Sequence, residues 1–126
     1  MPYRLFLWLF VFLMIAGCTP STQQPTNNMT NVKTAFASFL EEYHQERKYY
    51  YPLEATFAGD PTYNDRLPNV LTENYRDSLR AFYQKHKTGL SNFQIDQLDA
   101  EEQISYDILA WECELNLAEL SFPTHL

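Results

Sequence analysis

Residues 99–120 read DAEEQISYDILAWECELNLAEL, and this stretch decides the fold class. Asp99 followed by Glu102 is typical of a helix start, because the two side chains can cap each other's backbone amides. Apolar residues recur at spacings of three and four in two adjacent stripes: Ile104, Ile108, Trp111 and Leu115 in one, and Leu109, Cys113, Leu117 and Leu120 in the other. A helix that is apolar over more than half of its circumference packs against more than one neighbour.

A second helix is predicted over residues 72–88, just before this stretch. Thr72 is a suitable N-cap, and the cations Lys85 and Lys87 lie where the helix dipole favours positive charge. Gly89 is expected to end the helix as its C′ residue. The predicted apolar stripe consists of Leu71, Tyr75, Leu79, Phe82 and His86.

A third helix is predicted from residue 32 to the residue before Pro52, with Asn31 as its N-cap. Its apolar stripe contains Val32, Phe36, Phe39, Leu40, Tyr43, Arg47 and Tyr50, and the charged and amide side chains lie opposite. Residues 52–58 can form a short helix with Pro52 at its first position, and Gly59 then breaks it. Residues 60–69 are rich in Pro and Asn and are expected to form a loop.

Strand signals are absent from the sequence: no alternating run reaches five residues, and no Asn-Gly or Asp-Gly turn occurs. We therefore predict an all-α fold of three to four helices. These helices carry more apolar surface than so few elements can bury among themselves. We expect them to be packed as part of a larger helical domain, with the chain as the front part of a longer protein.

The amino-terminal residues have the pattern of an export signal. Arg4 precedes an apolar run at residues 5–16, which is too short to span a bilayer comfortably, since a span takes about 20 residues. The alternative reading of this run is an uncleaved anchor. The run ends in Ile15, Ala16, Gly17 and Cys18, which resembles the bacterial lipobox. We predict a lipoprotein signal peptide at residues 1–17, cleaved before Cys18.

Cys18 is then the lipidation site, and its thiol would carry a diacylglyceryl group that anchors the protein in a membrane. Thr19, in place of Asp, favours sorting to the outer membrane of a bacterial envelope over the inner one. Residues 18–31 hold no charge and few apolar side chains, so we predict a flexible, disordered tether there. The folded part is predicted at residues 32–126.

Cys113 is left without an intramolecular partner once Cys18 carries lipid. We interpret Cys113 as a small buried core residue. The alternative is a redox or nucleophilic thiol, which would need a neighbouring His or cation to lower its pKa. None lies at helical spacing from Cys113.

The charge balance excludes one class of partner. Sixteen Asp and Glu residues stand against nine Lys and Arg residues, giving a formal net charge of −7. Such a surface repels phosphate, so nucleic-acid binding is not expected. The length of 126 residues allows at most one small domain.

Metal and catalytic motifs are not expected in this chain. Glu41 and His44 have the local spacing of a di-iron bundle motif, but the second motif and the further carboxylates are missing. No His-Glu-x-x-His occurs. We interpret the glutamates of the last helix as a solvated face: Glu101, Glu102, Glu112, Glu114 and Glu119. The tyrosines at 49–51 either line a groove or pack against a missing partner.

Three segments carry a family resemblance: residues 52–59 (PLEATFAG), 63–69 (YNDRLPN) and 103–109 (QISYDIL). They resemble the amino-terminal region of the bacterial family called domain of unknown function 885, many of whose members are lipoproteins. The resemblance covers residues 32–126 and implies a longer, mostly helical protein of the zincin metallopeptidase type. The family's zinc segment, a His-Glu helix followed by Pro-Gly-His, lies far toward the carboxyl end.

None of those zinc positions exists in this sequence, so the resemblance transfers no catalytic residue and no metal ligand. It implies zinc and a peptide substrate only for a longer form. We therefore expect the amino-terminal part of a metallopeptidase-like envelope protein, inactive alone and without a cofactor of its own. The alternative is a complete small lipoprotein that acts as a protein-interaction module through its tyrosine-rich helix end.

Overall fold

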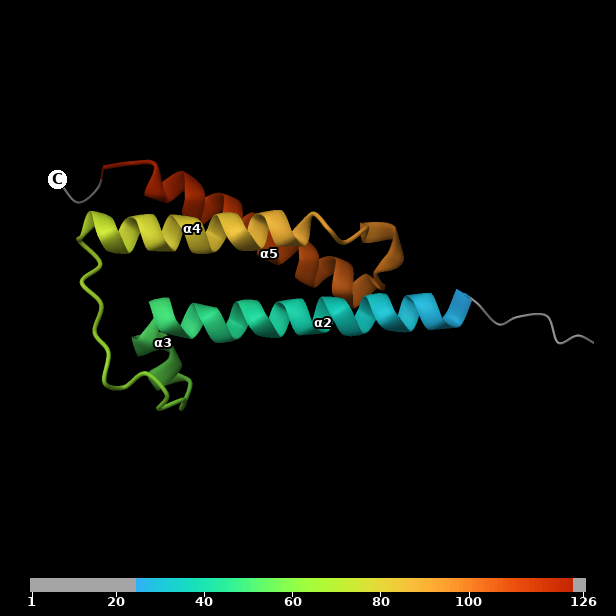
Figure 1. The fold of residues 1–126 in the computed structure, drawn as a ribbon, viewed down its shortest axis with the longest axis horizontal. Coiled ribbons are helices and arrows are strands. Elements are labelled where there is room, and N and C mark those ends of the chain that lie inside the picture. Colours follow the sequence, from blue (N-terminus) through green and yellow to red (C-terminus); the bar gives the residue numbers. More distant parts are fainter. Residues whose placement is uncertain (1–24, 124–126) are drawn as a thin grey trace, which may run out of the picture.

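The computed structural model describes residues 25–123, which are all-α and contain no strand. The helices are α2 (Pro25–Tyr50), α3 (Pro52–Phe57), α4 (Glu73–Leu90) and α5 (Ala100–Leu120), with a 3-10 turn, η1 (Ile95–Gln97), between the last two. Figure 1 shows α4 running antiparallel to α2 and α5 running back across α4. The predicted fold class is confirmed.

Helix α2 begins earlier than the sequence analysis expected. It starts at Pro25, so Asn31 is not its N-cap, and residues 25–31 of the predicted tether are helical. Proline fits the first turn of a helix, and the modest helix propensities of Asn and Thr are overridden once the helix continues into a packed segment. Residues 18–24 of the predicted tether and the predicted signal peptide lie outside the described residues.

Helix α3 has the predicted proline at its first position and ends at a glycine. Gly59 has a φ of 87°, a left-handed conformation that favours a residue without a Cβ. The Asp60 amide donates to the Ala55 carbonyl at 2.8 Å, and the Gly59 amide donates to the Thr56 carbonyl at 3.0 Å. These two bonds form a Schellman motif, which satisfies the last carbonyls of the short helix.

Helix α4 is capped as predicted at its start but not at its end. The Thr72 hydroxyl accepts a hydrogen bond from the Tyr75 amide at 3.3 Å. Gly89, expected as the C′ residue, lies inside the helix, which continues to Leu90. A Cβ at Gly89 would lie 2.7 Å from the ring of Phe39, so this glycine lets the Phe39 side chain of α2 lie directly against the backbone of α4. Leu71, expected on the buried stripe, precedes the helix and is exposed.

Aromatic side chains fill the space between α2 and α4. The rings of Tyr43 and Phe82 stack with centroids 5.3 Å apart, and Phe39 and Tyr43 both contact the ring of His86. Phe36, at the amino-terminal side of this layer, is almost fully buried. These large rings keep the two backbones apart, because interaxial distance depends on the side chains at the contact.

Helix α5 begins with the predicted capping box. The Asp99 carboxylate accepts from the Glu102 amide at 2.9 Å, and the Glu102 carboxylate accepts from the Asp99 amide at 2.8 Å. Asp99 also forms a 2.5 Å ion pair with Lys33 of α2. The same helix start is therefore satisfied locally and tied to a distant helix.

The carboxyl end of α5 is capped from α4 by arginines. Arg76, which is buried, donates to the Leu120 carbonyl at 3.0 Å and to the Phe122 carbonyl at 2.6 Å. Arg80 donates to the Leu120 carbonyl at 3.1 Å. The last turn of α5 contains no basic residue of its own, so these arginines supply the positive charge that a helix carboxyl terminus favours.

Candidate interaction surface

One of the two apolar stripes of α5 is exposed. We call its residues the α5 seam: Ile104, Ile108, Trp111 and Leu115, which are 61%, 58%, 64% and 48% exposed. At 3.6 residues per turn, these positions lie opposite the face that buries Leu109, Cys113 and Leu120. Helices α2 and α4 both pack on that buried face, and the seam has no partner among residues 25–123.

A second apolar surface lies on α3 and the loop that follows it. Phe57 is 88% exposed, the largest value among the large apolar side chains of residues 30–123. A cavity of about 300 Å³ lies between the start of α3 and this loop and is lined mainly by apolar atoms. Its lining includes Tyr50, Leu53, Leu67, Pro68, Val70 and Tyr75.

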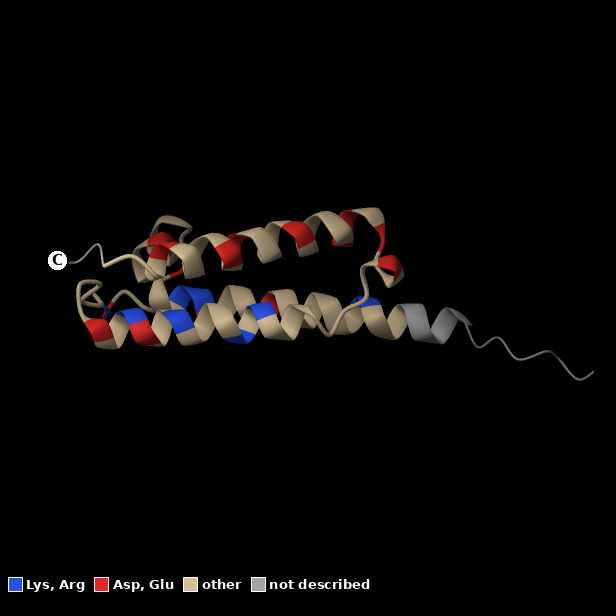
Figure 2. Cartoon of the chain, turned by 90° about the horizontal axis from the view of Figure 1, so that it is seen from above, with Lys and Arg blue, Asp and Glu red and all other residues tan. Residues whose placement is uncertain are grey.

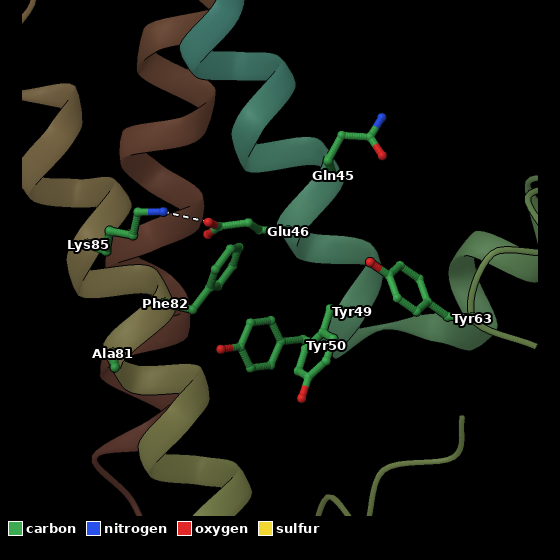
Figure 3. Close-up of a pocket in the computed structure, with 8 residues that line it drawn as sticks. All are labelled: Gln45, Glu46, Tyr49, Tyr50, Tyr63, Ala81, Phe82 and Lys85. Atoms are coloured by element: carbon green, nitrogen blue, oxygen red, sulfur yellow. Dashed lines mark hydrogen bonds and ion pairs between the residues drawn. The ribbon is translucent and has the colours of Figure 1, made fainter. Parts of the chain in front are cut away.

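A groove of about 470 Å³ runs between α2 and α4 and is lined at one end by tyrosines. Figure 3 shows Tyr49 and Tyr63 at this end and Glu46 and Lys85 at the other. The Tyr49 and Tyr63 rings meet edge to face with centroids 6.1 Å apart. The guanidinium of Arg66 lies 3.6 Å from the centre of the Tyr49 ring. These contacts pack the Tyr49 side chain against Tyr63 and Arg66 at this end of the groove.

Charged side chains close the other end of this groove. Glu46 accepts from Lys85 at 2.5 Å and pairs with the Nε2 atom of His86 at 2.8 Å. Partial burial opposes ionisation of Glu46, but the hydrogen bonds from Lys85 and His86 outweigh it and lower the pKa of the carboxyl. The ring of His86 is fully buried among aromatic side chains. No local pattern predicts this pair, because its members lie forty positions apart in the chain.

Two of the three tyrosines at the end of α2 form hydrogen bonds with other residues of the chain. The hydroxyls of Tyr51 and Tyr83 are 2.8 Å apart, and the Tyr75 hydroxyl donates to the Tyr50 carbonyl at 2.8 Å. Burial raises the pKa of Tyr75 to about 12. Tyr49 is the most exposed of the three tyrosines, and Tyr50 is half-buried and lines the groove beside it.

The predicted carboxylate and histidine positions do not form a metal centre within residues 25–123. Glu41 and His44 are both exposed, as expected. Glu112, predicted to be solvated, is half-buried and pairs with Arg47 at 3.1 Å. Across the described residues, no three His, Cys, Asp or Glu side chains are grouped so that they could hold a metal ion.

Of the two cysteines, only Cys113 lies within the described residues. Cys113 is fully buried, as predicted, and burial raises the pKa of its thiol to about 11. A reactive thiol needs the opposite shift, so the core interpretation of Cys113 is confirmed. Cys18, with Ile15, Ala16 and Gly17 of the predicted lipobox, lies outside the described residues.

Two further findings concern membrane spans and known relatives. Within residues 25–123, no helix combines the length and the apolar character that crossing a bilayer requires. Comparison with protein-family models, with curated proteins and with solved structures gave no match. The resemblance to family 885 therefore stays a prediction.

Proposed function

We propose that this chain is the amino-terminal helical part of a lipid-anchored, metallopeptidase-like envelope protein. Its helices would cover or line one side of a substrate cleft and would be inactive alone. The α5 seam is the observation that carries this proposal, because a line of large apolar side chains faces away from both neighbouring helices.

Exposed apolar surface is costly in water, at about 25 cal/mol for each Å². Contiguous apolar patches on soluble proteins mark surfaces that pack against something else. The exposed seam is therefore evidence that a further layer of protein packs on α5. The resemblance to family 885 suggests that this layer is the peptidase-like part of a longer protein.

The proposed anchor is lipid on Cys18, which makes a membrane the first partner of the protein. A single acyl chain binds membranes only reversibly, whereas a diacylglyceryl group with a further acyl chain holds a protein stably. Residues 25–50 are helical, so the spacer between the lipid and the folded part would be residues 18–24. We propose the outer membrane of a bacterial envelope as the location.

Zinc and a peptide substrate belong, in this proposal, to the longer form. A catalytic zinc site takes three protein ligands and leaves a position open for water. Because residues 25–123 contain no such ligand group, we assign no catalytic residue and no metal ligand to them. Their role would be support and coverage of the cleft.

The genomic DNA beyond the codon for Leu126 tests the proposal directly. We expect a continuing frame, or one restored by a single frameshift, that encodes a His-Glu helix and a Pro-Gly-His segment. A stop codon with no such frame nearby would contradict the proposal. Chelator-sensitive peptide hydrolysis by these 126 residues alone would contradict it as well.

The alternative function is a complete small lipoprotein that acts as an interaction module. The groove in Figure 3 favours this alternative, because Tyr49 and Tyr63 form an aromatic wall that is open to solvent. Solution behaviour separates the two functions. An autonomous module should be monodisperse, whereas a helical layer without its partner should aggregate through the exposed seam.

A further inference from the structure

Acidic side chains border the α5 seam along both of its edges. At 3.6 residues per turn, Asp107 and Glu114 flank the seam on one side, and Glu112 and Glu119 flank it on the other. Helix α5 contains no Lys or Arg, whereas α2 and α4 carry both (Figure 2). Glu112 and Glu114 already have cationic partners on those helices. Asp107 and Glu119 are exposed and form no ion pair with the described residues.

The spacing of the seam residues suits packing against another helix. Its residues are spaced four, three and four apart, the repeat at which two helices pack side by side. It spans about 16 Å, or about three helical turns. Trp111 lies near its middle, and buried tryptophans are frequent anchors of interfaces.

From this geometry we propose that the α5 seam binds an amphipathic α-helix whose apolar stripe is bordered by Lys and Arg on both sides. The inference rests on the proposed function, because the helix would belong to the peptidase-like part of the longer protein. Its cations would lie opposite Asp107 and Glu119, which have no ion pair with residues 25–123, unlike the flanking Glu112 and Glu114. Opposite charges beside an apolar seam set partner choice and orientation.

Two other occupants fit the charges less well. A second copy of α5, laid seam to seam, would place acidic edges against acidic edges, and like charges at these positions disfavour pairing. A membrane surface attracts helices whose polar edges carry Lys and Arg, and its anionic lipids repel carboxylates. The acidic borders therefore favour a basic helix.

Two synthetic helical peptides test the inference. Both carry the same Leu-rich stripe, but one has Lys and Arg at its borders and the other has Glu. Each is labelled with fluorescein and titrated with the full chain held in a non-ionic amphiphile, and the empty amphiphile serves as the blank. We expect the basic peptide to bind at least about tenfold more tightly and its affinity to fall with added salt.

Matched variants locate the binding. The double variant Ile108→Gln with Trp111→Gln removes the middle of the seam and should weaken basic-peptide binding by about tenfold or more. Phe57→Gln changes the most exposed aromatic residue of α3 and should leave the affinity unchanged. Asp107→Asn with Glu119→Gln should weaken binding by a few fold, as is typical of exposed charge pairs. Thermal melting of each variant confirms that it is folded.

Several results would overturn the inference. These are binding of neither peptide, equal or tighter binding of the acidic peptide, and loss of affinity in Phe57→Gln equal to that of the seam variant. Self-association that disappears in the seam variant would assign the seam to a second copy, and seam-dependent flotation with anionic vesicles would assign it to a membrane. The reading frame is an independent measurement: if it encodes the zinc segment while no peptide binds, only this inference fails.

Discussion

The two faces of α5 have similar apolar side chains and opposite surroundings. Leu109 and Cys113 on one face are 3% and 0% exposed, whereas Ile108 and Trp111 on the other are 58% and 64% exposed. Either stripe has the spacing to form a core. The apolar pattern of α5 therefore provides two faces that could form a core. Contacts outside this pattern are needed to explain why one of them is buried.

Polar contacts to neighbouring helices fix the rotation of α5 about its axis. At the start of α5, Lys33 forms an ion pair with the N-cap residue Asp99. At its end, Arg76 donates a hydrogen bond to the Leu120 carbonyl. Between these ends, Arg47 of α2 pairs with Glu112 on one side of the helix. A half-turn of α5 would move Glu112 away from Arg47, so this ion pair is compatible with the observed buried face and not with burial of the seam.

The largest expected effect comes from shortening a side chain on the buried face. Leu109→Ala leaves a cavity between α5 and its neighbours and should lower the free energy of unfolding by about 2–5 kcal/mol. The adjacent residue supplies the control: Ile108→Ala on the seam should change it by less than about 0.5 kcal/mol. Urea denaturation followed by circular dichroism measures both. Equal losses in the two variants would mean that both faces are buried in solution.

A smaller effect is expected from the arginine that caps α5. Arg76→Met keeps most of the side-chain length but removes the donors to the Leu120 and Phe122 carbonyls, which should cost about 1–3 kcal/mol. Arg80→Met is the matched control, because Arg80 is more exposed and should cost less than about 1 kcal/mol. The same denaturation experiment applies. Because Arg80 donates to the same Leu120 carbonyl, equal losses in the two variants would contradict the expectation that the buried Arg76 contributes more than the more exposed Arg80.

Features that depend on neighbouring residues were predictable from the sequence. The capping box of Asp99 with Glu102, the Thr72 cap and the start of α3 at Pro52 were all predicted and confirmed. Each of them involves groups within a few residues of one another, so composition and spacing determine them. The buried position of Cys113 also followed from its place on an apolar stripe.

Features that depend on distant partners were not predictable in this way. Gly89 had the pattern of a helix end, but its missing Cβ accommodates the ring of Phe39 from another helix. The pairing of His86 with Glu46 and the capping of α5 by Arg76 join residues about forty positions apart. The seam was recognised as apolar, yet its exposure depends on contacts that the sequence of α5 does not contain.

A chemical probe separates the two faces by the reactivity of a thiol and not by stability. In a Cys18→Ser background, Cys113 is the only thiol, and its pKa of about 11 leaves little thiolate at pH 8.5. A thiol on the seam, in Ile108→Cys with Cys113→Ala, should have an ordinary pKa and react about a hundredfold faster with a disulfide reagent. Cys113 should react faster as the pH rises toward 11. If both thiols react at the same rate below that pH, the buried face of α5 opens readily, and the contrast between the two faces is lost.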